Sequence, residues 1–230
     1  MHVGAAPAAA PDVPGEPLPG GFVARRLGRL PHPEAAHAMR AFTDARGADT
    51  ADELWLCEHP PTYTLGQAAR EGHVHDPGPI PLVATDRGGQ VTYHGPGQPI
   101  VYTLVDLRRR GLGVRAAVEA LEGAVIDLLA DEGIEARGRP EAPGVYVGEA
   151  KVAALGLRVR RGRSYHGLAF NADVDLAPFD RIDPCGYPGL AVTSARALGV
   201  ARPVEALAEA LLAAVARRLA AAGSAAPSPA

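Results

Sequence analysis

A glycine- and proline-rich stretch at residues 87–102 places the strongest constraint on the fold. Its glycines and prolines break it into two tight turns, and short β-favouring runs follow them at residues 91–93 and 100–104. Glycines let the backbone approach a ligand closely, and hydrogen-bonding side chains are dense here: Arg87, Thr92, Tyr93, His94 and Gln98. The stretch predicts a strand–turn–strand segment lining a binding site; a hairpin with a polar tip is the alternative for this stretch alone.

The spacing of apolar residues predicts the remaining elements. Strands are expected at residues 22–30, 53–58, 62–65, 144–147, 151–160 and 164–170, where apolar runs lie between turn residues. Helices are expected at residues 34–46, 114–131 and 204–221, the last two with an apolar residue every three or four positions. Because the strands are grouped between helices without regular β–α–β alternation, the pattern predicts an α+β domain.

Composition narrows the class of protein. The chain has 230 residues, 47% hydrophobic and 21% charged, which fits one large domain with a sizeable core. A formal net charge of −3 does not favour a nucleic-acid-binding protein. Neither a signal peptide nor an apolar run of membrane-spanning length is recognisable, so we expect a cytoplasmic protein. The Ala- and Pro-rich residues 1–20 and 223–230 are expected to be disordered tails around a domain at residues 21–222.

The two cysteines lie in different settings. Cys57 belongs to an apolar run and is expected to be buried, and no disulfide framework is needed. Cys185 lies in a loop, residues 183–189, that holds two prolines and two glycines. A cysteine on such a turn exposes its sulfur and has backbone N–H groups beside it, at Cys185 and Gly186, which suits a thiolate and an oxyanion hole. A half-buried loop cysteine without a role is the alternative.

Lys151 is a candidate partner for a reactive cysteine. If residues 151–160 form a strand without a bulge, Lys151 shares the apolar face with Ala153 and Leu155. Burial favours the neutral amine, which can act as a general base. The alternative is that Lys151, at the start of its strand, turns towards water.

Two charged patterns complete the candidates. His73 and His75 have the spacing of metal ligands, but no third ligand is evident, so no metal is expected. Arginines at positions 108–110, 158, 160, 161 and 163 could dock an acidic partner, or could form a solvated strand edge.

Three segments together resemble a known family. They are residues 87–102; residues 144–171, with Lys151 and His166-Gly167-x-Ala169-x-Asn171; and Pro184-Cys185-Gly186 followed by Val192-Thr193-Ser194. Their order and spacing over residues 21–200 resemble those of the lipoyl(octanoyl) transferases. The resemblance implies one domain with a mixed β-sheet flanked by helices, similar to the catalytic domains of biotin and lipoate protein ligases.

The resemblance also implies roles for individual residues. Cys185 would be the nucleophile that carries the acyl group as a thioester, and Lys151 the general acid and base. Neither a metal nor another cofactor is implied, because the donor thioester is already activated. Substrate-binding roles would fall on Arg87, Gly88, Gly89, Thr92, Tyr93, His94, Gly95, Gly97, Ala154, Leu155, Gly156, His166, Gly167, Ala169 and Asn171.

The implied reaction is the first step of protein lipoylation. An octanoyl group would move from octanoyl-acyl carrier protein to a lysine of lipoyl domains, found in 2-oxoacid dehydrogenase E2 subunits and the glycine cleavage H protein. We expect a monomer, because no exposed helical seam is evident. The rival interpretations are an ATP-dependent lipoate or biotin ligase, a non-catalytic protein that binds acyl carriers, and a thioesterase. The ligase would need an adenylate-binding loop, typically with three consecutive glycines, where this chain has Arg87-Gly88-Gly89.

Overall fold

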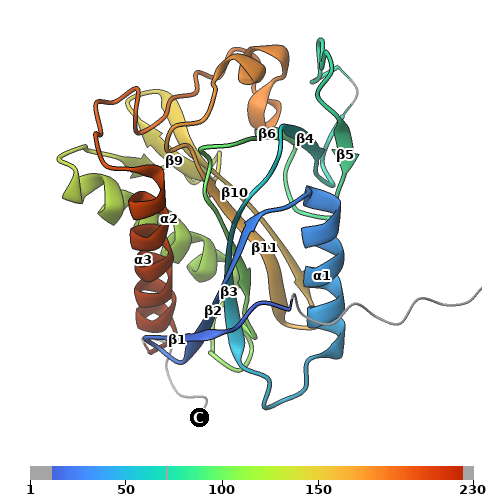
Figure 1. Ribbon diagram of the computed structural model, residues 1–230, viewed down its shortest axis with the longest axis vertical. Helices are drawn as coiled ribbons and strands as arrows, with labels where there is room; N and C mark the ends of the chain where they lie inside the picture. Colours follow the sequence, from blue (N-terminus) through green and yellow to red (C-terminus); the bar gives the residue numbers. More distant parts are fainter. Residues whose placement is uncertain (1–11, 71, 225–230) are drawn as a thin grey trace, which may run out of the picture.

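A mixed eight-stranded sheet forms the centre of the molecule. The computed structural model describes residues 12–70 and 72–224 (Figure 1). Across the sheet the strands are, in order, β1 (Glu16–Leu18), β2 (Phe22–Arg29), β3 (Asp52–Glu58), β7 (Ile100–Leu104), β11 (Arg163–Phe170), β10 (Ala150–Arg160), β9 (Gly144–Val147) and β8 (Arg137–Gly138). Strands β2 and β3 pair in parallel, and every other neighbouring pair is antiparallel. The expected mixed sheet is therefore confirmed.

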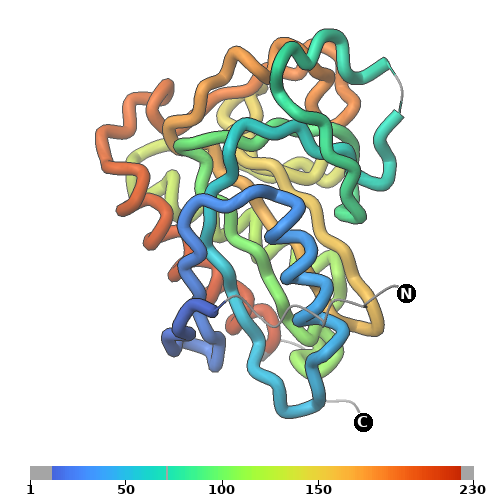
Figure 2. Tube along the Cα trace, turned by 45° about the vertical axis from the view of Figure 1, so that its right-hand side comes forward, coloured from blue at the N-terminus to red at the C-terminus, as the bar shows by residue number. Residues whose placement is uncertain are grey.

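A second sheet of three strands lies at one end of the first. It consists of β5 (Leu82–Ala84), β4 (Thr62–Leu65) and β6 (Val91–His94), with β4 in the middle. Strand β6 belongs to this small sheet, whereas β7, the next strand along the chain, belongs to the large one. The two strands predicted at residues 91–93 and 100–104 are thus present, but they do not pair as a hairpin. The turn between them joins the two sheets (Figure 2).

Helices cover both faces of the large sheet (Figure 1). Helix α1 (His32–Ala45) buries Met39 and Phe42 against Trp55 on one face. Helices α2 (Val114–Asp131) and α3 (Val204–Ser224) pack together on the other face, where they form the largest apolar core with β-strand residues. Their apolar repeat of three and four residues places one continuous stripe of each helix in that core. In the parts of the chain that are described, no helix has the length and apolarity needed to span a membrane.

The expected N-terminal boundary at residue 20 is wrong. Strand β1 lies within the predicted tail and pairs with β2, with Leu18 opposite Phe22, so backbone pairing orders this segment despite its Pro-rich composition. At the other end, α3 continues to Ser224, beyond the expected start of the tail at residue 223. Residues 1–11 and 225–230 of the expected tails lie outside the described residues. The short strand β8 was not expected.

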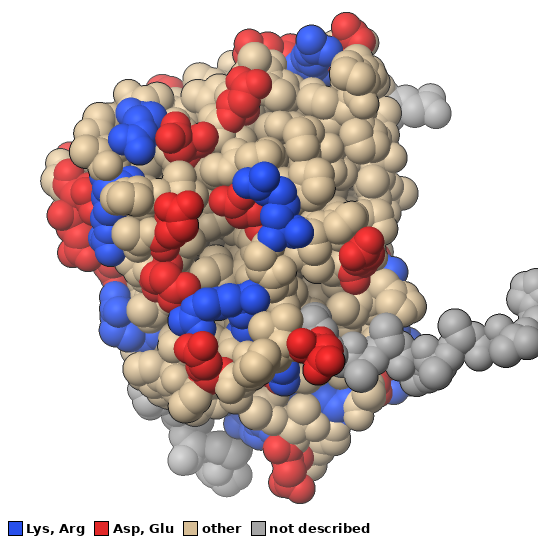
Figure 3. All heavy atoms as spheres, viewed as in Figure 1, with Lys and Arg blue, Asp and Glu red and all other residues tan. Residues whose placement is uncertain are grey.

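Several ion pairs lie on the molecular surface. Acidic and basic side chains are interspersed on the face shown in Figure 3, without a continuous basic region. Among the exposed pairs, Arg26 Nε lies 2.6 Å from Glu209 Oε1. A buried carboxylate also organises one end of the sheet: Asp52 accepts hydrogen bonds from Arg46, Arg109 and Arg110. Two of the arginines considered for docking are therefore bound within the chain.

Candidate active site

The side chains of Lys151 and Cys185 meet at one end of the large sheet. Lys151 Nζ donates a hydrogen bond to Cys185 Sγ at 2.8 Å and another to the carbonyl oxygen of Pro143 at 3.0 Å. The same Nζ atom also lies 5.3 Å from the centre of the Tyr146 ring. Only 3% of Lys151 is exposed. An amine in contact with a thiol can accept its proton and return it to a leaving group.

Strand β10 directs Lys151 inwards in spite of a bulge. The register with β9 shifts between Lys151 and Ala153, so simple alternation does not hold at this point. The backbone of Lys151 is instead paired with residues 191–193: its N–H donates to Ala191, and its carbonyl accepts from Thr193. Lys151 is therefore not at a fraying strand end, and the expectation that it might turn towards water is wrong.

Cys185 sits at a strained point of a tight turn. Its φ of 59° and ψ of 15° lie in the left-handed region, which is unusual for a residue with a side chain and typical of functional sites. The Gly186 N–H donates to the Asp183 carbonyl at 2.9 Å and thereby closes the turn. This hydrogen bond occupies one of the two N–H groups expected to form an oxyanion hole, so that expectation is wrong for Gly186.

A carboxylate anchors this turn from the side. The two oxygens of Asp183 accept hydrogen bonds from His73 Nδ1 and His75 Nε2, each at 2.9 Å. These hydrogen bonds hold the pKa of Asp183 below its ordinary value. The His73-x-His75 pair thus ties the Cys185 loop to the loop that follows β4.

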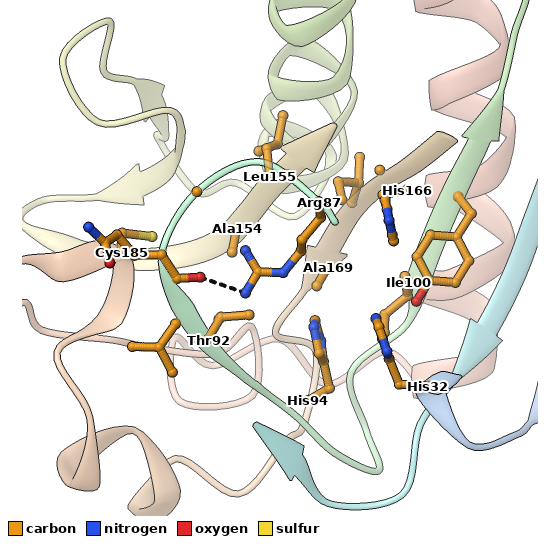
Figure 4. Close-up of a pocket in the computed structure, with 17 residues that line it drawn as sticks. His32, Arg87, Thr92, His94, Ile100, Ala154, Leu155, His166, Ala169 and Cys185 are labelled. Carbon is orange, nitrogen blue, oxygen red and sulfur yellow. Dashed lines mark hydrogen bonds between the residues drawn. The ribbon is translucent and has the colours of Figure 1, made fainter. Parts of the chain in front are cut away.

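A narrow cavity extends from Cys185 into the interior (Figure 4). Its walls combine apolar side chains, including Ile100, Ala154, Leu155 and Ala169, with the guanidinium of Arg87. In Figure 4, Cys185 lies at one end of the cavity and the histidine side chains lie at the other. A chain-like apolar group attached to the sulfur could extend along these walls.

Four imidazoles cluster at the inner end. His32 lies between His59, His94 and His166, with ring centres 5.2 to 6.2 Å apart. Burial lowers the pKa of His32 to about 3 and that of His59 to about 4, so both are neutral at neutral pH. His166 Nε2 forms a hydrogen bond with Asp86 Oδ1 at 2.9 Å. The Nδ1 atoms of His32 and His166 are buried and have no partner among the described residues.

Arg87 is a buried cation without a carboxylate partner among the described ion pairs. Its guanidinium donates to Thr64 Oγ1, to the carbonyl oxygens of Thr64 and Gly88, and to the Gln90 carbonyl, the contact dashed in Figure 4. Desolvation lowers its pKa to about 10, which still leaves it charged at neutral pH. Arg87 therefore brings a fixed positive charge into the cavity that ends at Cys185.

A second, open groove leaves Cys185 towards the surface. It has a volume of about 300 Å³ and runs between the 88–90 loop, the start of α2 and the 141–143 turn. Val114 and Tyr187, which line it, are 49% and 44% exposed, although both are large apolar side chains. The sulfur of Cys185 thus has a narrow cavity on one side and an apolar surface groove on the other.

Comparison with known proteins assigns this chain to a family. A family model for the lipoyl protein ligase A/B catalytic domain matches residues 32–216. A protein of Alkalilimnicola ehrlichii named octanoyltransferase is 64% identical over 183 residues, covering 80% of this chain and 85% of the relative. Another octanoyltransferase, from Aromatoleum aromaticum, is 56% identical over 218 residues, covering 95% and 93%. The chain belongs to the octanoyltransferase family.

Solved structures confirm the expected relation in fold. A crystal structure of lipoate-protein ligase A bound with ATP superposes with a TM-score of 0.69 over 85% of each chain, at 16% identity. Biotin protein ligase from Aquifex aeolicus, in complex with biotin and ATP, gives a TM-score of 0.53 over 86% of this chain and 70% of that one, at 11% identity. At these identities the likeness shows the fold alone.

Most of the residues expected to bind substrate are brought together in this octanoyltransferase. Those that line the narrow cavity are Arg87, Gly89, Thr92, His94, Ala154, Leu155, Gly156, His166, Gly167 and Ala169. Gly88 lies only in the open groove. Four others lie away from both, namely Tyr93, Gly95, Gly97 and Asn171.

Each of these four has a structural place instead. Tyr93 packs in the small apolar cluster of the second sheet, and Gly95 lies against the Tyr93 ring. Gly97 has a φ of 81°, and a Cβ there would come within 2.4 Å of the Asp173 carbonyl. Asn171 bridges Gln98 and the Thr193 carbonyl, and so supports the segment that pairs with Lys151.

Sequence reasoning missed several residues of the octanoyltransferase site. Gln90, His32 and Tyr102 line the cavity, and the side-chain oxygen of Gln90 is buried without a partner among the described residues. Gln90 follows Gly88-Gly89 directly, so its place within the glycine-rich stretch was a usable signal. The sequence around His32 carried no such signal, because His32 reaches the cavity only through the docking of α1 on the sheet.

Proposed function

We propose that this octanoyltransferase moves an octanoyl group from octanoyl-acyl carrier protein to a lysine of a lipoyl domain, through a thioester on Cys185. The observation that carries the proposal is the 2.8 Å hydrogen bond between buried Lys151 and Cys185. A nucleophile in contact with a base is what acyl transfer through a covalent intermediate requires.

In the first half-reaction, Lys151 accepts the proton of Cys185. The thiolate attacks the donor thioester, and the bond between the acyl carbon and the sulfur of the carrier's phosphopantetheine arm breaks. Lys151 then returns its proton to that leaving sulfur. The octanoyl chain remains bonded to Cys185, with its tail along the cavity that Ile100 and Ala169 line.

In the second half-reaction, the acceptor lysine enters as an amine. It attacks the Cys185 thioester, Lys151 takes the proton that this amine loses, and the Cys185 sulfur leaves with a proton from Lys151. An amide forms and the free enzyme is regenerated, without ATP, because the donor thioester supplies the driving force. No cofactor is required for either step.

The negative charge on the acyl oxygen is held beside the turn of residues 184–186. The Cys185 N–H and the side-chain amide of Gln90 are the donors in this proposal. Gln90 lies beside this turn: a Cβ placed on Gly186 would lie 3.2 Å from Gln90 Nε2. Such donors act strongly where water is excluded.

The open groove suits the arm of each protein substrate. A phosphopantetheine arm and a lysine side chain are both long and thin, and each must bring its end to Cys185 from the surface. Val114 and Tyr187 offer apolar contacts along that path. We place the reaction in a monomer in the cytoplasm, with E2 subunits and the glycine cleavage H protein as acceptors.

Two of the arginines considered for docking contribute little free charge to the binding of the acyl carrier protein. Arg160 pairs with Asp44 at 3.0 Å and Arg163 with Asp106 at 3.3 Å. Pairing of this kind leaves a reduced charge for an incoming acidic protein. These two arginines flank the turn between β10 and β11, which are interior strands, so they are better interpreted as partners of carboxylates within the chain than as a docking surface.

The experiment is an intact-mass spectrum after incubation with octanoyl-acyl carrier protein, followed by addition of an apo lipoyl domain without ATP. We expect one octanoyl group on the wild-type protein, which then passes to the lipoyl domain. Cys185→Ser should gain no group, whereas Cys57→Ser should behave as the wild type, because Cys57 is buried in β3. Transfer only from free acid with ATP would indicate a ligase, and release to water a thioesterase.

Replacing Lys151 by Met should abolish transfer and leave the fold intact. Methionine keeps the apolar stem and removes the amine, so the proton of Cys185 has no acceptor. Far-ultraviolet circular dichroism and a thermal melt verify folding, and the same mass assay measures transfer. Normal transfer in Lys151→Met would remove the lysine from the mechanism.

A further inference from the structure

One peptide unit connects the base to a carboxylate on helix α2. The carbonyl of the peptide between Pro143 and Gly144 accepts the 3.0 Å hydrogen bond from Lys151 Nζ. The N–H of the same peptide donates to Glu122 Oε1 at 2.8 Å. The atoms therefore form a series: carboxylate, peptide, amine and thiol.

Two glycines make room for this series. A Cβ on Gly144 would come within 2.3 Å of Lys151 Cε and 2.9 Å of its Nζ, so only glycine lets the lysine pass this close. A Cβ on Gly138 would lie 2.8 Å from Glu122 Oε2, so a side chain there would push the carboxylate away. The space at both ends of the peptide is thus fitted to these two charged side chains.

The electrostatics favour a charged partner for the lysine. A carboxylate that accepts from a peptide N–H polarises that peptide and makes its carbonyl oxygen a stronger acceptor. Burial and the charge of Glu119 raise the pKa of Glu122, while the Gly144 N–H and the charge of Lys151 act in the opposite direction. The polarised carbonyl stabilises most strongly the state in which Lys151 has taken the Cys185 proton and carries a full positive charge.

We propose that Glu122 is a positioning residue for this transferase, which acts through the peptide between Pro143 and Gly144 to orient Lys151 and to stabilise its protonated form. In this series Cys185 is the nucleophile, Lys151 is its base, and Glu122 is the group that orients the base. It touches neither substrate nor sulfur. The expected effect on kcat rests on the proposed function, whereas the expected effect on the reactivity of Cys185 rests on the geometry alone.

The test compares Glu122→Gln and Glu122→Ala with Glu119→Gln. Glutamine keeps an oxygen that can accept from Gly144 but removes the charge, whereas alanine removes both. Glu119 lies one turn earlier on the same helix, where it is exposed and pairs with Arg115, so its variant controls for charge loss on α2. The readouts are kcat and KM for octanoyl transfer, and the rate of iodoacetamide alkylation of the Cys185 peptide between pH 6 and pH 10.

We expect kcat to fall about tenfold in Glu122→Gln and up to about 100-fold in Glu122→Ala, the range for a hydrogen bond to a charged group, with KM for the donor unchanged. Alkylation of Cys185 should slow in parallel at neutral pH, and its pH profile should move towards higher pH. Glu119→Gln should lose neither kcat nor alkylation rate, because removing the charge of Glu119 favours the ionised form of Glu122.

Wild-type kcat and an unchanged alkylation profile in Glu122→Gln would overturn the proposal. So would a loss of thermal stability in both variants with an unchanged alkylation profile, which would indicate a purely structural brace. If Glu122→Ala does not fold, Glu122→Gln decides. If the wild-type protein accepts no octanoyl group while alkylation still depends on Glu122, the proposed function fails and the positioning role stands.

Discussion

At the scale of single residues, Arg87 stands out because it is a buried cation in the site. Among the described residues its acceptors are a threonine and backbone carbonyls, with no carboxylate, and burial of a cation without such a partner is expensive. Its charge and Cys185 interact electrostatically across the cavity. A fixed cation is useful there when the sulfur or the acyl oxygen becomes negative.

Two variants separate the charge of Arg87 from its hydrogen bonds. In Arg87→Gln, transfer should fall at least about tenfold and alkylation of Cys185 should slow, because the charge is lost. In Arg87→Lys, alkylation should remain closer to the wild type, while the free energy of unfolding falls by about 1 kcal/mol per lost hydrogen bond. Urea unfolding and peptide-resolved alkylation measure the two effects. Equal alkylation rates in both variants would exclude the role of the charge.

At the scale of elements, the site depends on close contact between strands β7 and β11. Gly167 on β11 lies opposite Tyr102 on β7. A Cβ on Gly167 would come within 2.0 Å of the Val101 carbonyl oxygen, which belongs to a backbone that cannot move aside without breaking the sheet. The wall of the cavity formed by residues 166–169 is set by this contact.

Gly167→Ala should therefore destabilise the protein by about 1 to 3 kcal/mol, the range for overpacking a well-packed position. Gly47→Ala is the matched control, because the nearest atom to a Cβ there is Thr50 Oγ1 at 4.0 Å; a change below about 0.5 kcal/mol is expected. Urea unfolding at neutral pH gives both values. Similar stabilities for the two variants would contradict the contact argument.

At the scale of the whole molecule, the neutral histidine cluster couples stability to pH. His32 and His59 keep pKa values of about 3 and about 4 in the folded state, against an ordinary value of 6.5. The unfolded chain therefore binds protons below pH 6.5 that the folded protein refuses, and stability falls as pH falls from 6.5 towards 4. Asp86, whose pKa is held low by His166, adds to this loss of stability only as the pH falls below its ordinary value of 3.8.

We expect the free energy of unfolding to be constant just above pH 6.5 and to fall below it by about 1.4 kcal/mol per pH unit for each buried histidine. His32→Asn should reduce that slope by the share of one histidine. His37→Asn, an exposed position on the same helix, should leave it unchanged. Urea unfolding at pH 7.5, 6.5, 5.5 and 4.5 measures the slopes; an unchanged slope in His32→Asn would contradict the account.

The sequence was informative wherever one short segment carried the signal. The helix at residues 114–131 and the strand at residues 100–104 were predicted with their observed bounds, because apolar periodicity and turn residues act locally. The contact between Lys151 and Cys185 joins residues 34 positions apart. The strand pattern offered Lys151 only as a candidate partner, and the family resemblance paired it with Cys185. Glu122 and His32 carried no local signal, because their roles arise from packing between elements that no spacing rule describes.

Because Cys57 is buried and Cys185 is not, a thiol reagent can distinguish the two cysteines of this chain. Cys57 is 3% exposed, and burial raises the pKa of its thiol, whereas Cys185 lies half-buried at the junction of the cavity and the groove. A thiol reagent should consume one equivalent in the native protein and two after denaturation. Once Cys185 carries an acyl group, the native count should fall to zero, so a colorimetric thiol titration gives the fraction of active enzyme in any preparation.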